Sequence, residues 1–204
     1  MGKVVLDITT SLDGFVAGPD DGPELGLGRG GERLHEWLVR LASWREPHGL
    51  EGGETNSSSE VVEEGLQATG AVVLGKRMFD NAQGWGDEPP FHKPVFVVTH
   101  AEREPLTKDG GTTFTFVTDG IESAVEQAKA AADDKDVSVA GGASIAQQCL
   151  RAGLLDEIQI HVAPLLLGGG VRLFDDTGGE QVELKPTRVI ESPGVTHLRY
   201  RVLK

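Results

Sequence analysis

The sequence predicts a single α/β domain over residues 1–204, with a mostly parallel central sheet, helices on both faces and an antiparallel C-terminal hairpin. Three observations predict this fold class. Short apolar strands alternate with helical patterns through the middle of the chain, which is typical of a parallel sheet covered by helices. Only strand patterns follow residue 157, and neither an internal repeat nor a polar linker divides the chain.

The N-terminal third contains one strand, a glycine-rich loop and two helices. Residues 3–10 (KVVLDITT) are rich in β-branched residues and predict a strand that ends at the SLDG turn. Glycine and proline are too frequent in residues 14–31 for regular structure. An apolar stripe of leucine, tryptophan and alanine predicts a helix over 32–44, and an S-x-x-E capping box opens a helix over 57–68.

The middle of the chain alternates strands and helices. Compact apolar runs predict strands over 71–75, 94–99, 113–117 and 137–140. Helical periodicity predicts helices over 76–82, 121–133 and 144–152. We expect Asp119 and Glu122 to cap the second of these helices and Gly153 to end the third.

The C-terminal part consists of strands. They are expected over 157–164, 171–174, 187–192 and 195–203. The tripeptide SPG at 192–194 predicts a turn that pairs the last two strands as a hairpin.

Composition excludes several classes of protein. Apolar residues make up 38% and charged residues 25%, as in globular proteins, and no apolar run approaches the roughly 18 residues of a membrane helix. The net charge of −13 argues against nucleic acid as a partner, because that binding neutralises phosphates with cations. Asp7 lies where an export signal needs apolar residues, and the one cysteine, Cys149, fits a reducing cytoplasm. The six histidines show no metal-ligand spacing, so we expect no metal.

Three strand ends share a design that suits an anionic ligand. Each of these apolar strands is followed by glycine or a short polar residue. The carboxyl ends of parallel strands lie at one edge of a sheet, so the three junctions are expected to lie together. The residues at these junctions are Gly75, Lys76 and Arg77; Thr99 and His100; and Ala140, Gly141, Gly142, Ala143 and Ser144. Glycine lets a phosphate approach backbone amides at a helix N-terminus. One such junction alone is equally well read as a tight turn, but three together favour a phosphate site.

The basic residues at this edge indicate the kind of dinucleotide. Lys76 and Arg77 occupy a first helical turn, where the helix dipole alone favours acids, so cations there indicate an anion to bind. A 2′-phosphate is paired by arginine rather than by a carboxylate, so NADPH is favoured over NADH. Residues 26–31 (GLGRGG) match G-x-G-x-x-G by letters, but no strand leads into them. They are expected to form a mobile loop over the site.

With these residues identified, the chain resembles the dihydrofolate reductase-like superfamily. The branch is that of the C-terminal reductase domain of the bifunctional riboflavin-biosynthesis deaminase–reductase. The resemblance covers nearly the whole chain. It is carried by SLDGFVA (11–17), VVLGKRMFD (72–80), PVFVVTH (94–100), VAGGASIAQQCL (139–150) and LLDEIQIHVAPLLLGGGVRLF (154–174).

The resemblance implies a cofactor and a set of site residues. It assigns the three strand ends, Ala140 included, to the NADPH phosphates, and it places the SLDG loop, with Ala17, near nicotinamide and substrate. Asp13 is then the candidate proton carrier, with Asp87 as the other possibility. The substrate-binding candidates are Gly14, Phe15, Trp85 and Asp87.

Two departures separate the chain from that branch. Ala140 stands where the riboflavin-pathway reductases typically have glutamate, and the nearest match to their Asp-Asp-Pro is residues 87–89 (DEP). The deaminase half has no counterpart in these residues. Dihydrofolate reductases themselves place a carboxylate on the first long helix, where Glu32 and Glu36 are available but lie off the apolar stripe.

The sequence therefore predicts a cytoplasmic, NADPH-dependent reductase that transfers hydride to a small heterocyclic or ribosylamino substrate. It resembles 5-amino-6-(5-phosphoribosylamino)uracil reductase of riboflavin biosynthesis. Pterin reduction, a non-catalytic NADPH-binding module and an assembly protein are the alternatives. We expect a homodimer and neither a nucleic-acid nor a membrane partner.

Overall fold

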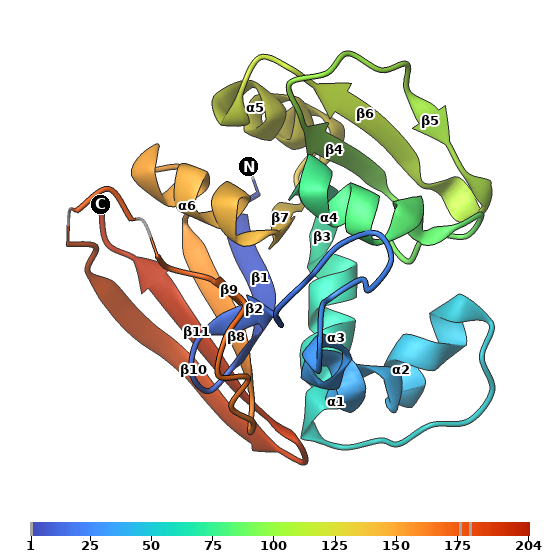
Figure 1. Ribbon diagram of the computed structural model, residues 1–204, viewed down its shortest axis with the longest axis vertical. Helices are drawn as coiled ribbons and strands as arrows, with labels where there is room; N and C mark the ends of the chain where they lie inside the picture. The colour runs from blue at the N-terminus through green and yellow to red at the C-terminus, as the bar shows by residue number, and fades with distance from the viewer. Residues whose placement is uncertain (1, 176, 180) are drawn as a thin grey trace.

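A large sheet runs through the molecule (Figure 1). The computed structural model describes residues 2–175, 177–179 and 181–204, and within these residues the sheet has nine strands in the order β10-β11-β8-β1-β7-β3-β4-β6-β5. Its strands are β1 (Val4–Ser11), β3 (Thr69–Gly75), β4 (Pro94–Val98), β5 (Leu106–Thr107), β6 (Thr113–Val117), β7 (Asp136–Gly141), β8 (Glu157–Ala163), β10 (Leu184–Ser192) and β11 (Val195–Val202). Two further short strands, β2 (Phe15–Ala17) and β9 (Val171–Arg172), pair separately.

The sheet is mostly parallel, as predicted. The strands from β8 through β1, β7, β3 and β4 to β6 all pair in parallel. At one side β11 pairs antiparallel with β8 and β10, and the predicted hairpin joins Ser192 to Val195. The helices are α1 (Glu36–Val39), α2 (Ala42–Arg45), α3 (Ser57–Ala68), α4 (Lys76–Asn81), α5 (Ile121–Ala131) and α6 (Ala143–Arg151). Short 3₁₀ turns span Gly31–His35, Glu46–His48, Gln83–Trp85 and Asp109–Gly111.

Helices cover both faces of the sheet because successive strand residues point to opposite sides. On β3, Val73 packs in one core with α5 and α6, while its neighbours Val72 and Leu74 pack in another with Phe79 of α4. The apolar runs predicted as strands are buried on both faces for this reason.

The prediction of a single helix over 32–44 is wrong. A 3₁₀ turn and two short helices replace it, with Leu41 between them in an extended conformation. The amide of Glu54 donates to the Arg40 carbonyl at 2.7 Å, and the Ala42 amide donates to the Glu54 carbonyl at 2.9 Å. This pairing with a distant segment takes the backbone groups that a continuous helix would use, while Leu41 stays fully buried.

The expected helix caps also differ from the structure. Asn56 caps α3, and its side chain accepts from the Ser58 amide. The Ser59 hydroxyl accepts from the Asn56 amide, so the capping box is formed by Asn56 and Ser59 rather than by Ser57 and Glu60. Gly120 precedes α5 without a side-chain cap, so Asp119 and Glu122 do not cap it. The strands β2 and β5 were missed because two or three residues carry no periodic pattern.

The one cysteine lies in the core and is expected to be unreactive. Cys149 on α6 is fully buried, and burial together with the nearby Glu122 raises the pKa of its thiol to about 12. Because the thiolate is the reactive form, a disulfide reagent at mild alkaline pH should not label native protein and should label it stoichiometrically in denaturant. Fast labelling of the native protein would contradict this placement.

Candidate functional site

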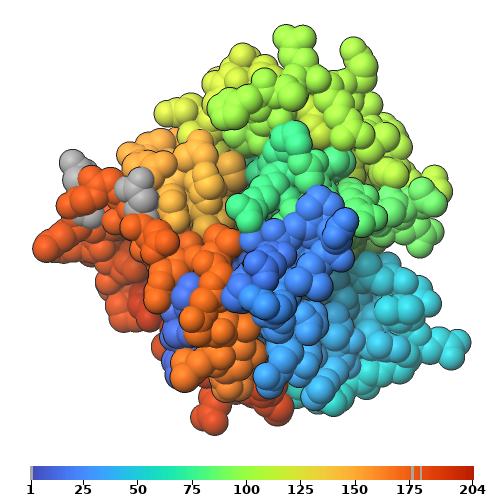
Figure 2. Space-filling view, in the orientation of Figure 1, coloured from blue at the N-terminus to red at the C-terminus, as the bar shows by residue number. Residues whose placement is uncertain are grey.

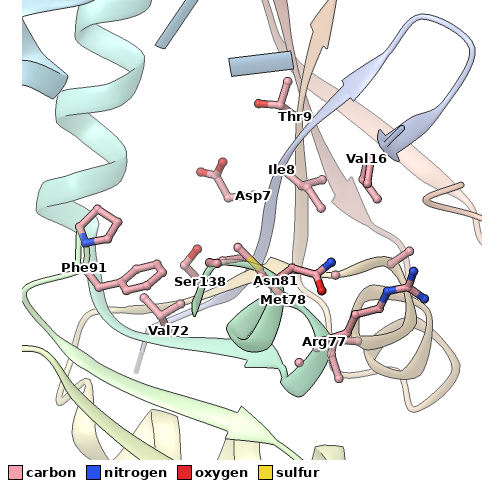
Figure 3. Close-up of a pocket in the computed structure, with 18 of the residues that line it drawn as sticks. Asp7, Ile8, Thr9, Val16, Val72, Arg77, Met78, Asn81, Phe91 and Ser138 are labelled. Carbon is pink, nitrogen blue, oxygen red and sulfur yellow. The ribbon is translucent and has the colours of Figure 1, made fainter. Parts of the chain in front are cut away.

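A cavity of about 1020 Å³ opens between the carboxyl ends of β3, β4 and β7 and continues beneath α3 (Figure 3). A volume of this size matches the upper end of cofactor and ligand sites. The predicted site residues that line it are Ala17, Gly75, Lys76, Arg77, Trp85, Thr99, His100, Ala140, Gly142, Ala143 and Ser144. The cavity thus joins all three predicted strand ends.

The strand ends meet because their strands are neighbours in the sheet. β3 lies between β7 and β4, and the parallel register aligns Gly75 with Val98 and Leu74 with Gly141. Gly75 packs so closely on α6 that a Cβ there would lie 2.8 Å from Ile145. Glycine at this position therefore lets α6 approach the end of β3.

The N-terminus of α6 is the part of the cavity best suited to an anion. Gly142 precedes this helix, no side chain caps it, and a Cβ at Gly142 would meet no atom within 4 Å. Gly141 has a φ of 129°, a conformation that favours glycine, and the peptide bond between the two glycines is cis. Backbone amides and the helix dipole face the open cavity here, so these residues fit the phosphates of a dinucleotide.

The predicted cations that follow the end of β3, Lys76 and Arg77, have acidic partners. Arg77 forms an ion pair with Asp21, whose carboxylate also accepts from the Asn81 amide at 2.9 Å. Lys76 pairs with Asp80 one helical turn away. Figure 2 shows the segment that carries Asp21 lying against α4. Because Asp21 and Leu27 also line the cavity, the loop predicted over the site does form part of its wall.

The deeper part of the cavity has apolar and aromatic walls. Trp85, which the sequence singled out as a substrate wall, stacks over Phe114 and meets Phe91 edge to face. Trp37 and Trp44 also line the cavity. Lys93 is half-buried in this wall, and burial lowers the pKa of its ammonium group, with Lys135 adding repulsion. Such walls suit a planar ring.

Five predicted residues lie outside the cavity lining. They are Asp13, Gly14, Phe15, Asp87 and Gly141. The Asp13 carboxylate accepts from the Ser11 hydroxyl and from the amides of Leu167 and Gly168. Burial alone would raise the pKa of Asp13, but these hydrogen bonds outweigh it and the pKa is lowered. An ionised carboxylate that anchors a turn is a poor proton donor, and the catalytic role of Asp13 stays a prediction.

Phe15 and Asp87 have other neighbours in the structure. Phe15 is buried beneath the guanidinium of Arg172, which lies 4.4 Å from the ring centroid. The Asp87 side chain is 95% exposed and lies 3.8 Å from Lys108. Glu32 and Glu36, the carboxylates expected on the first helix, are both exposed.

Sequence reasoning missed the carboxylate that does face the cavity. Asp7 of β1 lies there, with Gln159 and His161 of β8 beside it. Polar residues at every second position of a strand buried on both sides are the signal that was available. Asp7 and Thr9 follow this spacing on β1, as do Gln159 and His161 on β8.

Two histidines beside the cavity are expected to make stability depend on pH. Burial lowers the pKa of His35 and of His197 from 6.5 to about 4, and repulsion from His161 adds to both shifts. Between these values the unfolded chain binds more protons than the folded one, so the free energy of unfolding falls as pH drops from about 6.5 to about 4. Urea midpoints measured across this range should fall more steeply for wild type than for His35→Asn. Equal slopes would contradict the shift at His35.

Other classes of site are not seen in the described part of the chain. Among residues 2–175, 177–179 and 181–204, no group of three or more His, Cys, Asp or Glu side chains is arranged to hold a metal ion. None of the helices built from these residues combines the length and the apolar character needed to cross a membrane.

Two proteins of known sequence are similar to this chain. YyaP, an uncharacterised protein of Bacillus subtilis, is 24% identical over 210 residues, which cover 97% of this chain and 94% of YyaP. The riboflavin biosynthesis protein RibD of Mycobacterium tuberculosis is 44% identical over 54 residues, 26% of this chain and 16% of that protein.

Solved structures share the fold. A putative riboflavin biosynthesis protein from Shewanella superposes with a TM-score of 0.65 at 22% identity, over 99% of both chains. A deaminase/5-amino-6-(5-phosphoribosylamino)uracil reductase from Thermotoga maritima superposes with a TM-score of 0.62 at 15% identity, over 99% of this chain and 57% of that one. These likenesses confirm the dihydrofolate reductase-like fold class expected from the sequence.

The family model of the RibD C-terminal domain matches residues 2–198, from before β1 into β11. This range contains the three strand ends, the N-terminus of α6 and the residues that line the cavity. The chain belongs to the RibD C-terminal domain family.

Proposed function

We propose that the protein is an NADPH-dependent reductase of a small planar heterocycle or ribosylamino compound, similar to 5-amino-6-(5-phosphoribosylamino)uracil reductase. One observation carries the proposal. A single cavity connects an uncapped helix N-terminus, flanked by strand-end cations, to an aromatic compartment that contains a carboxylate. A dinucleotide and a ring that receives its hydride need these two environments side by side.

The residues of the cavity divide between two tasks. Gly142, Ala143 and Ser144 would hold the pyrophosphate at the α6 N-terminus, and Arg77 would pair with the 2′-phosphate. When bound, the reduced nicotinamide supplies a hydride to the substrate. Trp85 and Trp37 would orient the substrate ring and exclude water from it.

Binding and turnover test this proposal together. We expect NADPH to bind more tightly than NADH, and one substrate among a ribosylaminopyrimidine, a pterin and a quinone to support steady NADPH oxidation. NADPH binding without turnover across the panel would favour a binding module. Failure to bind NADPH would overturn the proposal and leave an assembly role.

The ion pair of Arg77 with Asp21 allows a sharper test of NADPH preference. Arg77→Ala should weaken NADPH by about 1–3 kcal/mol and leave NADH unchanged, because only NADPH has the 2′-phosphate. Asp21→Asn removes the competing carboxylate and should strengthen NADPH alone. Equal effects of either substitution on both dinucleotides, measured by calorimetry, would contradict the assignment of Arg77.

A cytoplasmic location and a homodimer remain predictions. The buried thiol of Cys149 fits a reducing compartment. The exposed edge strand β10 offers backbone groups through which two copies could pair.

A further inference from the structure

Polar side chains line the cavity from three neighbouring strands of the sheet. Asp7 of β1, Ser138 of β7 and His161 of β8 all line the deep part of the cavity. Figure 3 shows the Asp7 side chain directed from β1 into the space beside α3. The Asp7 side chain is 32% exposed, whereas that of His161 is 8% exposed. Of Asp7 and His161, Asp7 is therefore the one that a bound molecule can reach more readily.

A chain of short hydrogen bonds runs from Asp7 away from the cavity. Its Oδ1 lies 2.8 Å from Nε2 of His161, and Nδ1 of His161 lies 2.6 Å from Nδ1 of His197. Nε2 of His197 lies 2.8 Å from Oγ of Ser58. The chain continues through Ser192 to Asn56, at 2.7 and 3.1 Å. Strands β1, β8, β10 and β11 and the N-terminal end of α3 supply these residues.

The far end of this chain fixes the direction of every hydrogen bond in it. Oδ1 of Asn56 accepts from the Ser58 amide and from the Ser192 hydroxyl, so Ser192 has used its one hydrogen. Ser58 then donates its one hydrogen to Ser192. The oxygen of Ser58 is left as an acceptor, and Nε2 of His197 must be the donor to it.

The same count continues to the cavity. Burial lowers the pKa of His197 to about 4, so this ring is neutral at pH 7 and its hydrogen lies on Nε2. Nδ1 of His197 therefore accepts, and Nδ1 of His161 carries the hydrogen between the two rings. One more proton must lie between Nε2 of His161 and Oδ1 of Asp7, because two lone pairs would otherwise face each other at 2.8 Å.

We propose that Asp7 is the proton donor of the reduction, and that His161 is the positioning residue that keeps a proton stored on the pair. The proposal rests on the proposed function and names the acid that this function lacks. It takes the place of the relay by Asp13, whose oxygens are engaged in the turn.

The proton balances the reaction. Hydride transfer to the carbon of a C=N or C=O bond brings both electrons and one hydrogen, and the π pair moves onto the nitrogen or oxygen. That atom takes the proton held by Asp7 and His161, which leaves an aspartate carboxylate beside a neutral imidazole. A proton from solvent restores the pair after the product leaves. Because the proton that the pair holds lies on the Oδ1 side, the carboxyl group of Asp7 must turn about its Cβ–Cγ bond to bring the proton to the substrate. Among the described residues, Oδ2 makes a long contact to Gln159, at 3.4 Å, which opposes such a turn only weakly.

The groups around the pair keep His197 neutral. Three titratable groups face His161 of β8: Asp7 of β1, His197 of β11 and His35 of the 3₁₀ turn before α1. Arg188 of β10 repels a proton on His197 and is itself held by Glu60 and Glu64 of α3. His197 therefore stays neutral at working pH.

Nitrogen NMR of the histidine rings tests the proton placement without cofactor or substrate. At neutral pH, Nδ1 of His161 should be protonated, and His197 should be neutral with its hydrogen on Nε2. A Ser58→Ala variant removes the acceptor that fixes this direction and should shift both rings toward the opposite tautomers. Wild-type protein with an unprotonated Nδ1 on His161 would overturn the proposal.

Turnover with whichever compound of the panel supports NADPH oxidation tests the catalytic step. Asp7→Asn should lower kcat by roughly 100- to 10,000-fold and leave NADPH affinity within about 2-fold. His161→Gln should lower kcat less and leave KM unchanged, because His161 positions the donor without touching the substrate. The charge-matched control Asp109→Asn, on an exposed turn away from the cavity, should behave as wild type.

The outcomes separate this proposal from the proposed function. A wild-type protein that neither binds nor oxidises NADPH would remove the proposed function, and the donor role with it. Active wild type together with a fully active Asp7→Asn would remove the donor role and leave the reductase standing. If Asp7→Asn loses both NADPH binding and its melting transition, the variant has failed to fold. The histidine tautomers of the wild-type protein, measured by NMR, then decide whether the donor role holds.

Discussion

Replacement of Gly142 by aspartate is expected to lower NADPH affinity by roughly 100-fold, about 2.7 kcal/mol, without destabilising the protein. A Cβ at Gly142 points into open cavity, and its φ of −78° and ψ of −165° suit an aspartate. The new carboxylate would accept from the first amides of α6 and place a negative charge where the phosphates are proposed to bind. As a helix cap it should add stability of about 0.5–2 kcal/mol.

The neutral variant Gly142→Asn separates charge from occupancy. Asparagine caps a helix as well as aspartate does, but it brings no charge, so its loss of NADPH affinity should be clearly smaller. Calorimetric titration and thermal melting of the two variants give affinity and stability in parallel. Equal NADPH affinities of the Gly142→Asp variant and the wild-type protein would show that the phosphates do not bind at α6.

Phe114→Ala is expected to lower the free energy of unfolding by about 3–5 kcal/mol, the largest effect on stability that we predict. Phe114 on β6 is fully buried and lies between the ring of Phe79, 5.0 Å away edge to face, and that of Trp85, 6.2 Å away and stacked. Removing the ring leaves a cavity beneath the aromatic wall of the site. Denaturant unfolding gives the energy, and NADPH turnover should fall as Trp85 loses its support.

A neighbour on the same strand serves as the matched control. Phe116 is partly exposed and meets Phe79 and the guanidinium of Arg103. Folding removes less apolar surface of Phe116 than of Phe114 from water. Phe116→Ala should therefore lower the free energy of unfolding clearly less than Phe114→Ala. Equal losses in the two variants would contradict the central position of Phe114 in this core.

Local patterns in the sequence were enough to predict the sheet and its cavity edge. The strands over 71–75 and 137–140 and the glycines that follow them depend on residues adjacent in the chain. The parallel arrangement then places Gly75, Thr99 and Gly142 together without further information. The helix over 32–44 failed because the groups that interrupt it, at Glu54, are distant in sequence.

The polar chain from Asp7 to Asn56 was out of reach for the same reason. His161 and His197 each read as an isolated polar residue on a strand, and only the pairing of β11 with β8 sets them opposite each other. Ser58 appeared as part of a helix start, whereas its hydroxyl reaches His197, 139 residues away. Contacts between elements, rather than patterns within them, create this part of the site.

Titration of isotopically labelled protein with NADPH, followed through its backbone amides, tests the central claim most directly. The account predicts that the largest shifts fall on Gly142, Ala143 and Ser144 and at the ends of β3 and β4, and that Gly142→Asp abolishes them. Shifts confined to other surfaces, or an unchanged spectrum at saturating NADPH, would contradict it.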